Sequence, residues 1–316
     1  MSDFGLTLVD YSTISKKASS VDYEITKRLF HILANKCNRS TRRALDLPKD
    51  LLAIDSTTIT VGKNRMPWAK FKGEKSGVKL HIALNVTQMT PSQVEETIAS
   101  RHDGPVGEKL ANSESILVED RAYGKLTRFD EFKKFKQWFV IRIKENITTY
   151  YPSSLKSILQ EDSTIIEDIT CKLGKGEKRT NNRFRFVKFK DFNGKTIRVC
   201  TNIMYLHPEK IADIYKERWK VETFFRFIKQ NLNVKRLFGT SQNAVYNQLF
   251  CALMAYILLY FVYAQASKRW KYVKLSLIQF IRKLCSDNLE AEVRVSVYFV
   301  MEKIRQMKVN YMVNIS

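Results

Sequence analysis

The sequence IADIYKERWKVETFFRFIKQNL, residues 211–232, has the periodicity of an amphipathic helix. At about 100° per residue, four polar side chains fall within an arc of roughly 60° and form one stripe. They are Tyr215, Arg218, Glu222 and Lys229. An adjacent apolar sector predicts packing against a sheet. A solvated helix face with an Arg218–Glu222 pair at i, i+4 spacing is the simplest explanation of the stripe taken alone.

Two aspartates upstream of this helix follow apolar, strand-like runs. Asp55 follows residues 51–54, and Asp120 follows residues 116–118 with Glu119 between. Two strand-borne aspartates beside a helix-borne glutamate supply the hard oxygen ligands that two Mg²⁺ ions need to bridge a phosphate. Acids after apolar strands are also frequent as edge or cap residues. The pattern alone does not choose between Glu119 and Asp120.

The segments around these acids predict a mixed α/β sheet. Strand patterns occupy residues 51–61, 77–87, 95–100, 115–119 and 138–144, with a helix at 125–136. An amphipathic helix is expected near the N-terminus, where Val21, Ile25, Leu29, Ile32 and Leu33 recur at helical spacing. From Pro208 onward the chain is predicted to be helical, over residues 209–232, 243–268, 275–284 and 290–307.

Residues 146–204 differ from both flanks, because β-type runs at 165–173, 184–192 and 196–202 alternate with Gly and Asn turns. Within residues 172–190 there are eight basic residues and a single acid, Glu177. On a strand, the alternation after residue 183 places cations on one face and phenylalanine rings on the other. Two interpretations remain: a half-buried hairpin with a solvated basic face, or a DNA contact. The DNA-contact candidates are Arg183, Arg185 and Lys188.

The whole chain is strongly basic, with 54 Lys and Arg against 32 Asp and Glu and a net charge of +22. Such a field attracts polyanions, so nucleic acid is the leading partner and an anionic membrane the competitor. The uncharged run at residues 249–264 is shorter than the roughly 20 residues that cross a bilayer, which favours a buried helix over a membrane span. Five separated cysteines without zinc-ligand spacing predict a reduced, cytoplasmic setting.

Three motifs resemble those of a known family. Tyr215, Arg218, Glu222 and Lys229 have the spacing of the Tyr, Arg, Glu, Lys signature of bacterial insertion-sequence transposases of the family numbered four, members of the DDE superfamily. Residues 120–124, Asp-Arg-Ala-Tyr-Gly, resemble the second motif of that family, and residues 54–58, Ile-Asp-Ser-Thr-Thr, resemble the first. The resemblance spans about residues 51–233 and selects Asp120 over Glu119.

The resemblance implies an α/β fold, with a ribonuclease H-like mixed sheet flanked by helices, a β-rich insertion before the Glu-bearing helix, and a helical C-terminus. The corresponding division has four parts. They are a helical N-terminal segment (1–48), a catalytic domain (49–145 and 205–268), the insertion (146–204) and a C-terminal helical region (269–316). The segment before Asp55 is shorter than is usual in the family, so we expect it to be a shortened DNA-binding region.

Carried over residue by residue, the resemblance implies that Asp55, Asp120 and Glu222 bind two divalent ions, Mg²⁺ or Mn²⁺. Arg218 and Lys229 are then expected to hold a DNA-end phosphate, and Tyr215 to orient it. The implied reaction is cleavage at transposon ends followed by strand transfer.

The partners that this reaction implies are double-stranded DNA, as inverted repeats and target, and a second copy of the chain in a synaptic homodimer. The setting is the bacterial cytoplasm and nucleoid, without a membrane. Two alternatives stay open: a catalytically incompetent, DNA-binding truncated derivative acting as a regulator, and a membrane-surface protein.

Overall fold

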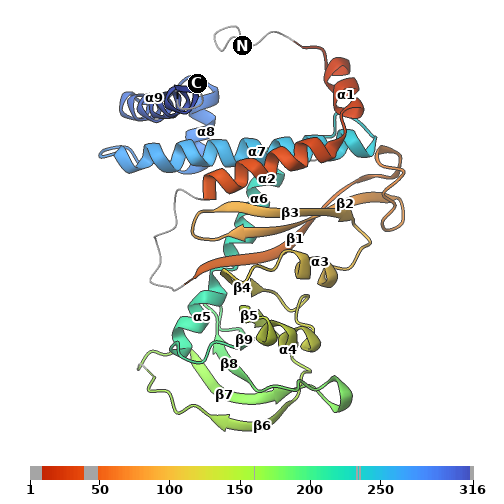
Figure 1. Ribbon diagram of the computed structural model, residues 1–316, viewed down its shortest axis with the longest axis vertical. Coiled ribbons are helices and arrows are strands. Elements are labelled where there is room, and N and C mark those ends of the chain that lie inside the picture. Colours follow the sequence, from red (N-terminus) through yellow and green to blue (C-terminus); the bar gives the residue numbers. More distant parts are fainter. Residues whose placement is uncertain (1–8, 39–48, 160, 233, 235, 314–316) are drawn as a thin grey trace. The chain divides into compact units, whose positions relative to one another are not determined.

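The computed structural model describes residues 9–38, 49–159, 161–232, 234 and 236–313 (Figure 1). Parts of the predicted N-terminal segment, residues 1–8 and 39–48, lie outside these residues. The chain divides into two compact units, Met1–Phe250 and Cys251–Ser316. The finer four-part division remains a prediction.

A mixed sheet forms the centre of the first unit. Its first part consists of β1 (Asp50–Gly62), β2 (Lys75–Asn85), β3 (Thr90–Ile98), β4 (Ser115–Glu119) and β5 (Trp138–Arg142). β1 pairs antiparallel with β2 and β2 with β3, whereas β1–β4 and β4–β5 are parallel pairs. The long β1 is rich in Ile, Thr and Val, which suit a pleated, half-buried surface. The strands predicted around the two aspartates are thus confirmed.

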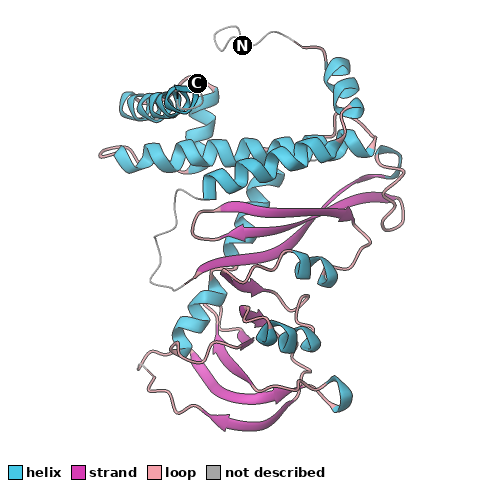
Figure 2. Ribbon diagram, viewed as in Figure 1, coloured by secondary structure: helices cyan, strands magenta, loops and turns pink. Residues whose placement is uncertain are grey.

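The β-rich insertion extends the same sheet. It contains β6 (Thr149–Ser154), β7 (Ile165–Leu173), β8 (Phe184–Lys190) and β9 (Thr196–Thr201). Because β9 pairs with β5, the nine strands run in the order β3-β2-β1-β4-β5-β9-β8-β7-β6. Figure 2 shows the strands in magenta. The insertion therefore covers the edge of β5, which would otherwise present unpaired backbone groups. The predicted fold class, with a β-rich insertion before the Glu-bearing helix, is confirmed.

Two helices precede the sheet, α1 (Tyr11–Ser20) and α2 (Tyr23–Asn38), where the sequence predicts one. The apolar side chains that indicate the helix are not the buried ones: Ile25 and Leu29 are more than half exposed, whereas Phe30 is fully buried. The physical reason is that α2 buries paired polar groups. Thr26 donates to Asn247, and Lys27 contacts Glu95 and Glu96 of β3.

The helix predicted over residues 209–232 is interrupted, giving α5 (Pro208–Lys216) and α6 (Trp219–Asn231). Across the junction the amides of Arg218, Lys220 and Val221 donate to carbonyls three residues earlier. This 3₁₀-type winding has about 3.0 residues per turn instead of 3.6, so it rotates α6 relative to a continuous helix. Side chains three residues apart eclipse in such a turn. Accordingly, the Arg218 guanidinium lies 5.8 Å from the centre of the Tyr215 ring.

The two faces of β1 have different environments. Ile54 belongs to a buried apolar cluster with Phe129 and Phe132 of α4 (Leu126–Lys134). Successive strand residues point to opposite faces, so Asp55 points away from this cluster and towards α6. The short α3 (Gly104–Lys109) leads into β4. The alternation along β1 thus separates the packing face from the face that carries the acid.

α7 (Gln242–Ala266) crosses the division between the units, and its first turns pack in the first unit, where Phe250 contacts Phe30. By length and composition alone, α7 and the residues after it could also span a membrane, a criterion that core helices of soluble proteins meet too. α8 (Leu277–Cys285) and α9 (Ala291–Val313) belong to the second unit. The predicted C-terminal helices are confirmed.

His81 on β2 gives the stability of the fold a predictable dependence on pH. Its side chain is fully buried, and burial lowers its pKa from 6.5 to about 4, although Asp103 opposes the shift. Between pH 6.5 and about pH 4, His81 therefore binds a proton in the unfolded chain but not in the folded chain. The contribution of His81 to stability is fully present above pH 6.5 and falls as the pH drops towards 4, by about 2 kcal/mol between pH 7 and pH 5.

Urea unfolding at several pH values measures this dependence. His81→Gln is expected to remove this contribution, so the change in unfolding free energy from pH 7 to pH 5 should be about 2 kcal/mol more favourable in the variant than in wild type. His102→Gln, the same substitution at an exposed histidine, is the matched control. An unchanged slope in His81→Gln contradicts the assignment.

Candidate active site

Asp55 and Asp120 lie side by side on the sheet. The parallel register pairs Ile54 of β1 with Glu119 of β4, so the residues that follow, Asp55 and Asp120, occupy corresponding positions on neighbouring strands. Adjacent strands are about 4.8 Å apart, which brings two carboxylates into range of a shared cation. Rigid strands thus fix the two aspartates that the sequence pattern singles out.

Glu119 and Asp120 are adjacent in sequence but point to opposite faces. The Glu119 carboxyl is completely buried, 3.8 Å from the Arg128 guanidinium, and burial raises its pKa to about 8. Asp120 instead accepts a hydrogen bond of 3.3 Å from the Tyr215 hydroxyl, and its side chain is 30% exposed. Only Asp120 shares the solvent-accessible face with Asp55.

The helical junction supplies the third carboxylate. Glu222 lies in the first turn of α6 and accepts a hydrogen bond of 2.6 Å from the Arg218 guanidinium. A second nitrogen of Arg218 lies 3.4 Å from the Asp55 carboxylate. One arginine therefore bridges an acid of the sheet and an acid of the helix.

The electrostatics of the site follow from burial and crowding of like charges. The pKa of Asp55 is raised to about 6, mainly by burial and to a smaller extent by Asp120 and Glu222. Arg218 and the backbone N–H of Ser56 oppose the shift. The proximity of the three acids therefore makes an ionised Asp55 costly unless a cation is present.

Arg142 is a site residue that the sequence pattern did not reveal. It ends β5, and its guanidinium lies 3.8 Å from the Asp120 carboxylate. A Cβ on Gly124 would come within 3.0 Å of the Arg142 carbonyl, so the turn after Asp120 packs tightly against β5. An arginine at the end of a strand is too common to be noticed without the sheet order. That order places β5 beside β4.

Three further residues predicted to contact DNA are basic, and they lie on α6 and in the insertion. Lys229 is on α6, two turns beyond Glu222. Half-buried Arg183 donates to the carbonyls of Tyr151 and Thr170, and Lys188 is half-buried on β8. The structure brings Tyr215, Arg218 and Glu222 together with the two aspartates, whereas Arg183 is bonded to backbone carbonyls of the insertion.

Arg185 is not on an exposed basic face, which corrects the alternation inferred from the sequence. It is 2% exposed and forms a two-pronged ion pair with Asp168, with both contacts at 2.8 Å. Its remaining nitrogen donates to the Leu206 carbonyl. Four successive residues of β8, Phe184 to Val187, are buried, so both faces of the strand are covered there and its arginine needs an internal partner.

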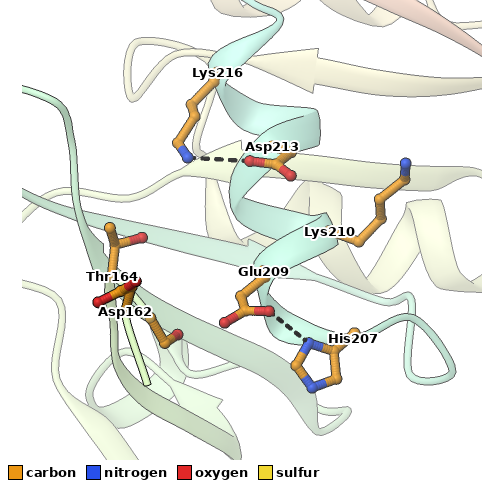
Figure 3. A pocket seen from close by; sticks show the side chains of 8 residues that line it. Asp162, Thr164, His207, Glu209, Lys210, Asp213 and Lys216 are labelled. Atoms are coloured by element: carbon orange, nitrogen blue, oxygen red, sulfur yellow. Dashed lines mark hydrogen bonds and ion pairs between the residues drawn. The ribbon is translucent and has the colours of Figure 1, made fainter. Parts of the chain in front are cut away.

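A surface pocket of about 500 Å³ lies between the segment before β7 and α5 (Figure 3). Four of its side chains form two pairs: His207 contacts Glu209, and Lys216 contacts Asp213. The pocket contains neither Asp55, Asp120 nor Glu222. It is separate from the carboxylate site.

The donor chemistry of the carboxylate site fits a hard divalent cation. Asp55, Asp120 and Glu222 offer carboxylate oxygens, which Mg²⁺ prefers. Among the described residues, no three His, Cys, Asp or Glu side chains stand close enough to hold an ion as they are. In the site, the Arg218 guanidinium contacts two of the acids and supplies the neutralising charge.

A mixed sheet that carries two aspartates beside a helix-borne glutamate is an arrangement suited to metal-dependent phosphoryl transfer. The family model of the transposase DDE domain matches residues 46–258. The chain belongs to the DDE transposases, the enzymes of DNA transposition with nuclease and strand-transfer activity. This membership implies dependence on a divalent metal.

Individual relatives agree with this family. The chain is 51% identical over 286 residues to a probable transposase for insertion sequence element IS5377 of Geobacillus stearothermophilus, covering 90% of this chain and 76% of that protein. It is 33% identical to putative transposase y4zB of Sinorhizobium fredii, over 73% of this chain and 65% of the relative. A piggyBac transposase synaptic complex with hairpin DNA matches with a TM-score of 0.41 and 14% identity, over 78% of this chain and 54% of that one.

Removing the Tyr215 hydroxyl tests its hydrogen bond to Asp120. We expect Tyr215→Phe to lower the rate of metal-dependent DNA cleavage roughly 10-fold to 100-fold, because the partners of metal-binding carboxylates typically contribute that much. DNA affinity and the unfolding midpoint should stay near wild type. Tyr272→Phe, at a side chain 91% exposed, is the matched control. A wild-type cleavage rate in Tyr215→Phe excludes a role for this contact.

The Arg185–Asp168 pair makes a separate prediction about stability. Arg185→Met should lower the free energy of unfolding by about 3–5 kcal/mol, because Asp168 is left charged and buried. The double variant Arg185→Met/Asp168→Leu should recover most of this loss. Lys188→Met, on the same strand, should have little effect. An unfolding curve of Arg185→Met that superimposes on wild type contradicts the burial of this pair.

Proposed function

We propose that Asp55, Asp120 and Glu222 are the catalytic acids of this transposase and hold two Mg²⁺ or Mn²⁺ ions. The observation that carries the proposal is the arrangement of β1, β4 and α6, which places three carboxylates on one solvent-accessible face, around Tyr215 and Arg218. Glu119 is excluded from this role because it is buried on the opposite face beside Arg128. When bound, the ions supply activation of a water or a 3′ hydroxyl and stabilisation of the leaving oxygen.

The neighbouring side chains bind and orient the DNA phosphate in this proposal. Arg218 has five N–H donors in a planar fork, and two of its nitrogens contact acids in the structure. Its guanidinium can turn to a phosphate without leaving the site. Tyr215 keeps Asp120 oriented through its hydroxyl. Arg142, beside Asp120, is a further cation within reach of a phosphate.

The DNA partners are proposed to be the inverted repeats of the element and a target duplex. The net charge of +22 supports binding of a polyanion. Lys229, Arg183 and Lys188 remain proposed DNA contacts, whereas the burial of Arg185 removes it from this set. The assembly of two copies on two DNA ends rests on the family resemblance.

The setting is proposed to be the bacterial cytoplasm, in association with the nucleoid. All five cysteines are free, which is typical of a reducing compartment. A catalytically incompetent derivative is not favoured, because all three acids are present and converge.

Substitution of the three acids tests the proposal. Asp55→Asn, Asp120→Asn and Glu222→Gln should each abolish Mg²⁺- or Mn²⁺-dependent cleavage of DNA that carries the ends of the element, because each removes a metal ligand. Affinity for the same DNA should stay within a few-fold of wild type, since phosphate contacts dominate binding. Gel assays of cleavage and fluorescence anisotropy measure the two properties on the same samples.

Glu119→Gln is the control for the acid series, because it removes a neighbouring carboxylate from the opposite face of the sheet. It should cleave at close to the wild-type rate. Cleavage that survives any one of the three substitutions, or that is lost in Glu119→Gln alone, overturns the assignment.

A further inference from the structure

The hairpin between β1 and β2 extends beyond the strands that flank it. β4 pairs with β1 only as far as Ile54, and β3 pairs with β2 only from Val78 onward. The two central strands continue together to Gly62 and Lys75 (Figure 1). Residues 62–75, named here the basic hairpin, therefore project past the end of the sheet.

The basic hairpin is rich in exposed cations. Its exposed basic residues are Lys63, Arg65, Lys70, Lys72 and Lys75, and Glu74 is its single acid. Glu74 pairs with Lys63 at 3.3 Å. In the part of the chain that the structure describes, no acidic side chain contacts the other four cations. Their uncompensated charge fits a polyanion.

Several contacts hold the tip of the basic hairpin in one position. Arg65 donates to the Leu237 carbonyl at 2.7 Å, and the Trp68 indole donates to the Thr240 carbonyl at 2.7 Å. Met66 and Ala69 are fully buried. Leu237 and Thr240 belong to the segment that follows α6. The cations are therefore presented on a fixed support that is tied to the helix carrying Glu222.

A pocket of about 640 Å³ opens beside this anchor. Its polar lining includes two arginines, the exposed Arg65 and Arg236, together with Tyr11 and Thr60. One Arg65 nitrogen is occupied by Leu237, which leaves further N–H donors of both guanidinium groups for a ligand. The Tyr11 hydroxyl donates to the Leu237 carbonyl, so the donors suited to the oxygens of a phosphodiester are the two guanidinium groups and the Thr60 hydroxyl.

The position of the pocket relates it to the carboxylate site. Gly62 is seven residues beyond Asp55 on the same strand, which is ~23 Å at 3.3 Å per residue. Duplex DNA rises 3.4 Å per base pair, so the same distance corresponds to roughly seven base pairs. A duplex with one end at the carboxylates reaches the basic hairpin within its first helical turn.

We propose that the Arg65–Arg236 pocket and the cations of the basic hairpin bind the phosphate backbone of duplex DNA about seven base pairs from the bond that is cleaved. The inference rests on the proposed function only for the position of the cleaved bond. The contact is made to phosphates and not to base edges, so it strengthens binding of any sequence and fixes the direction in which the duplex leaves the site.

Salt-dependent binding to a duplex of arbitrary sequence tests the proposal. Fluorescence anisotropy with a labelled duplex of about two helical turns is compared between wild type and Arg65→Ala/Arg236→Ala. We expect the double variant to lose affinity roughly tenfold at low salt. The slope of log affinity against log salt should fall by roughly 1.8, since two phosphate contacts are removed.

Matched variants distinguish DNA binding at the Arg65–Arg236 pocket from nonspecific attraction by the positive charge of the whole protein. Lys133→Ala/Lys134→Ala removes two exposed cations of α4 and should change affinity much less. Lys70→Ala/Lys72→Ala/Lys75→Ala removes hairpin cations that take no part in the anchor, so it should weaken binding even if the Arg65 variant is unstable. Thermal melting of every variant establishes that each one is folded.

The possible outcomes are distinct. If wild type does not bind the duplex, the proposed function itself fails. If wild type binds, but the arginine and lysine variants bind equally well with an unchanged salt slope, the inference fails and the proposed function stands. Flotation with vesicles of equal parts phosphatidylcholine and phosphatidylglycerol tests whether the same cations bind an anionic membrane instead of DNA. Loss of vesicle binding in the variants, with DNA binding intact, overturns the assignment to DNA.

Discussion

The contact of Arg218 with both Asp55 and Glu222 is the interaction on which the site depends. Three carboxylates at one point repel each other, and each loses hydration on burial, so they stay together only beside a positive charge. In the structure Arg218 supplies that charge from the junction between α5 and α6. The sheet, the helical junction and the acids therefore form one electrostatic unit.

The junction between α5 and α6 explains how a helix contributes two different groups to this unit. A continuous α-helix would place Tyr215 and Arg218 about 60° apart, whereas 3₁₀-type winding stacks them. Tyr215 can then bind Asp120 of β4 while Arg218 reaches Asp55 of β1. The local winding lets one segment of chain orient acids from two neighbouring strands.

Much of the fold was predictable from the sequence because the strand signals are strong and local. Alternation and β-branched residues locate β1, β4 and β7 to within one or two residues of their observed ends. The choice between Glu119 and Asp120 was not predictable in this way, since it depends on which face of β4 packs against α4. The burial of Arg185 and the position of Arg142 also depend on which strands become neighbours. Local patterns do not contain that information.

The interruption at residues 217–218 escaped prediction for a different reason. No Pro or Gly marks it, and the backbone angles of Glu217 and Arg218 stay in the helical region. Only the hydrogen bonds change, from four-residue to three-residue spacing. The spacing of Tyr215, Arg218 and Glu222 in the sequence still indicated the site, because this spacing together with the 3₁₀-type winding brings the three side chains to the aspartates.

Direct measurement of metal binding tests the central claim, that three acids from β1, β4 and α6 form one divalent metal site. Electron paramagnetic resonance of Mn²⁺ titrated into the DNA-free protein reports bound ions without any need for cleavage. Wild type and Glu119→Gln should bind Mn²⁺ alike, whereas Asp55→Asn, Asp120→Asn and Glu222→Gln should each bind it far more weakly. Equal binding by wild type and the three acid variants would contradict the account.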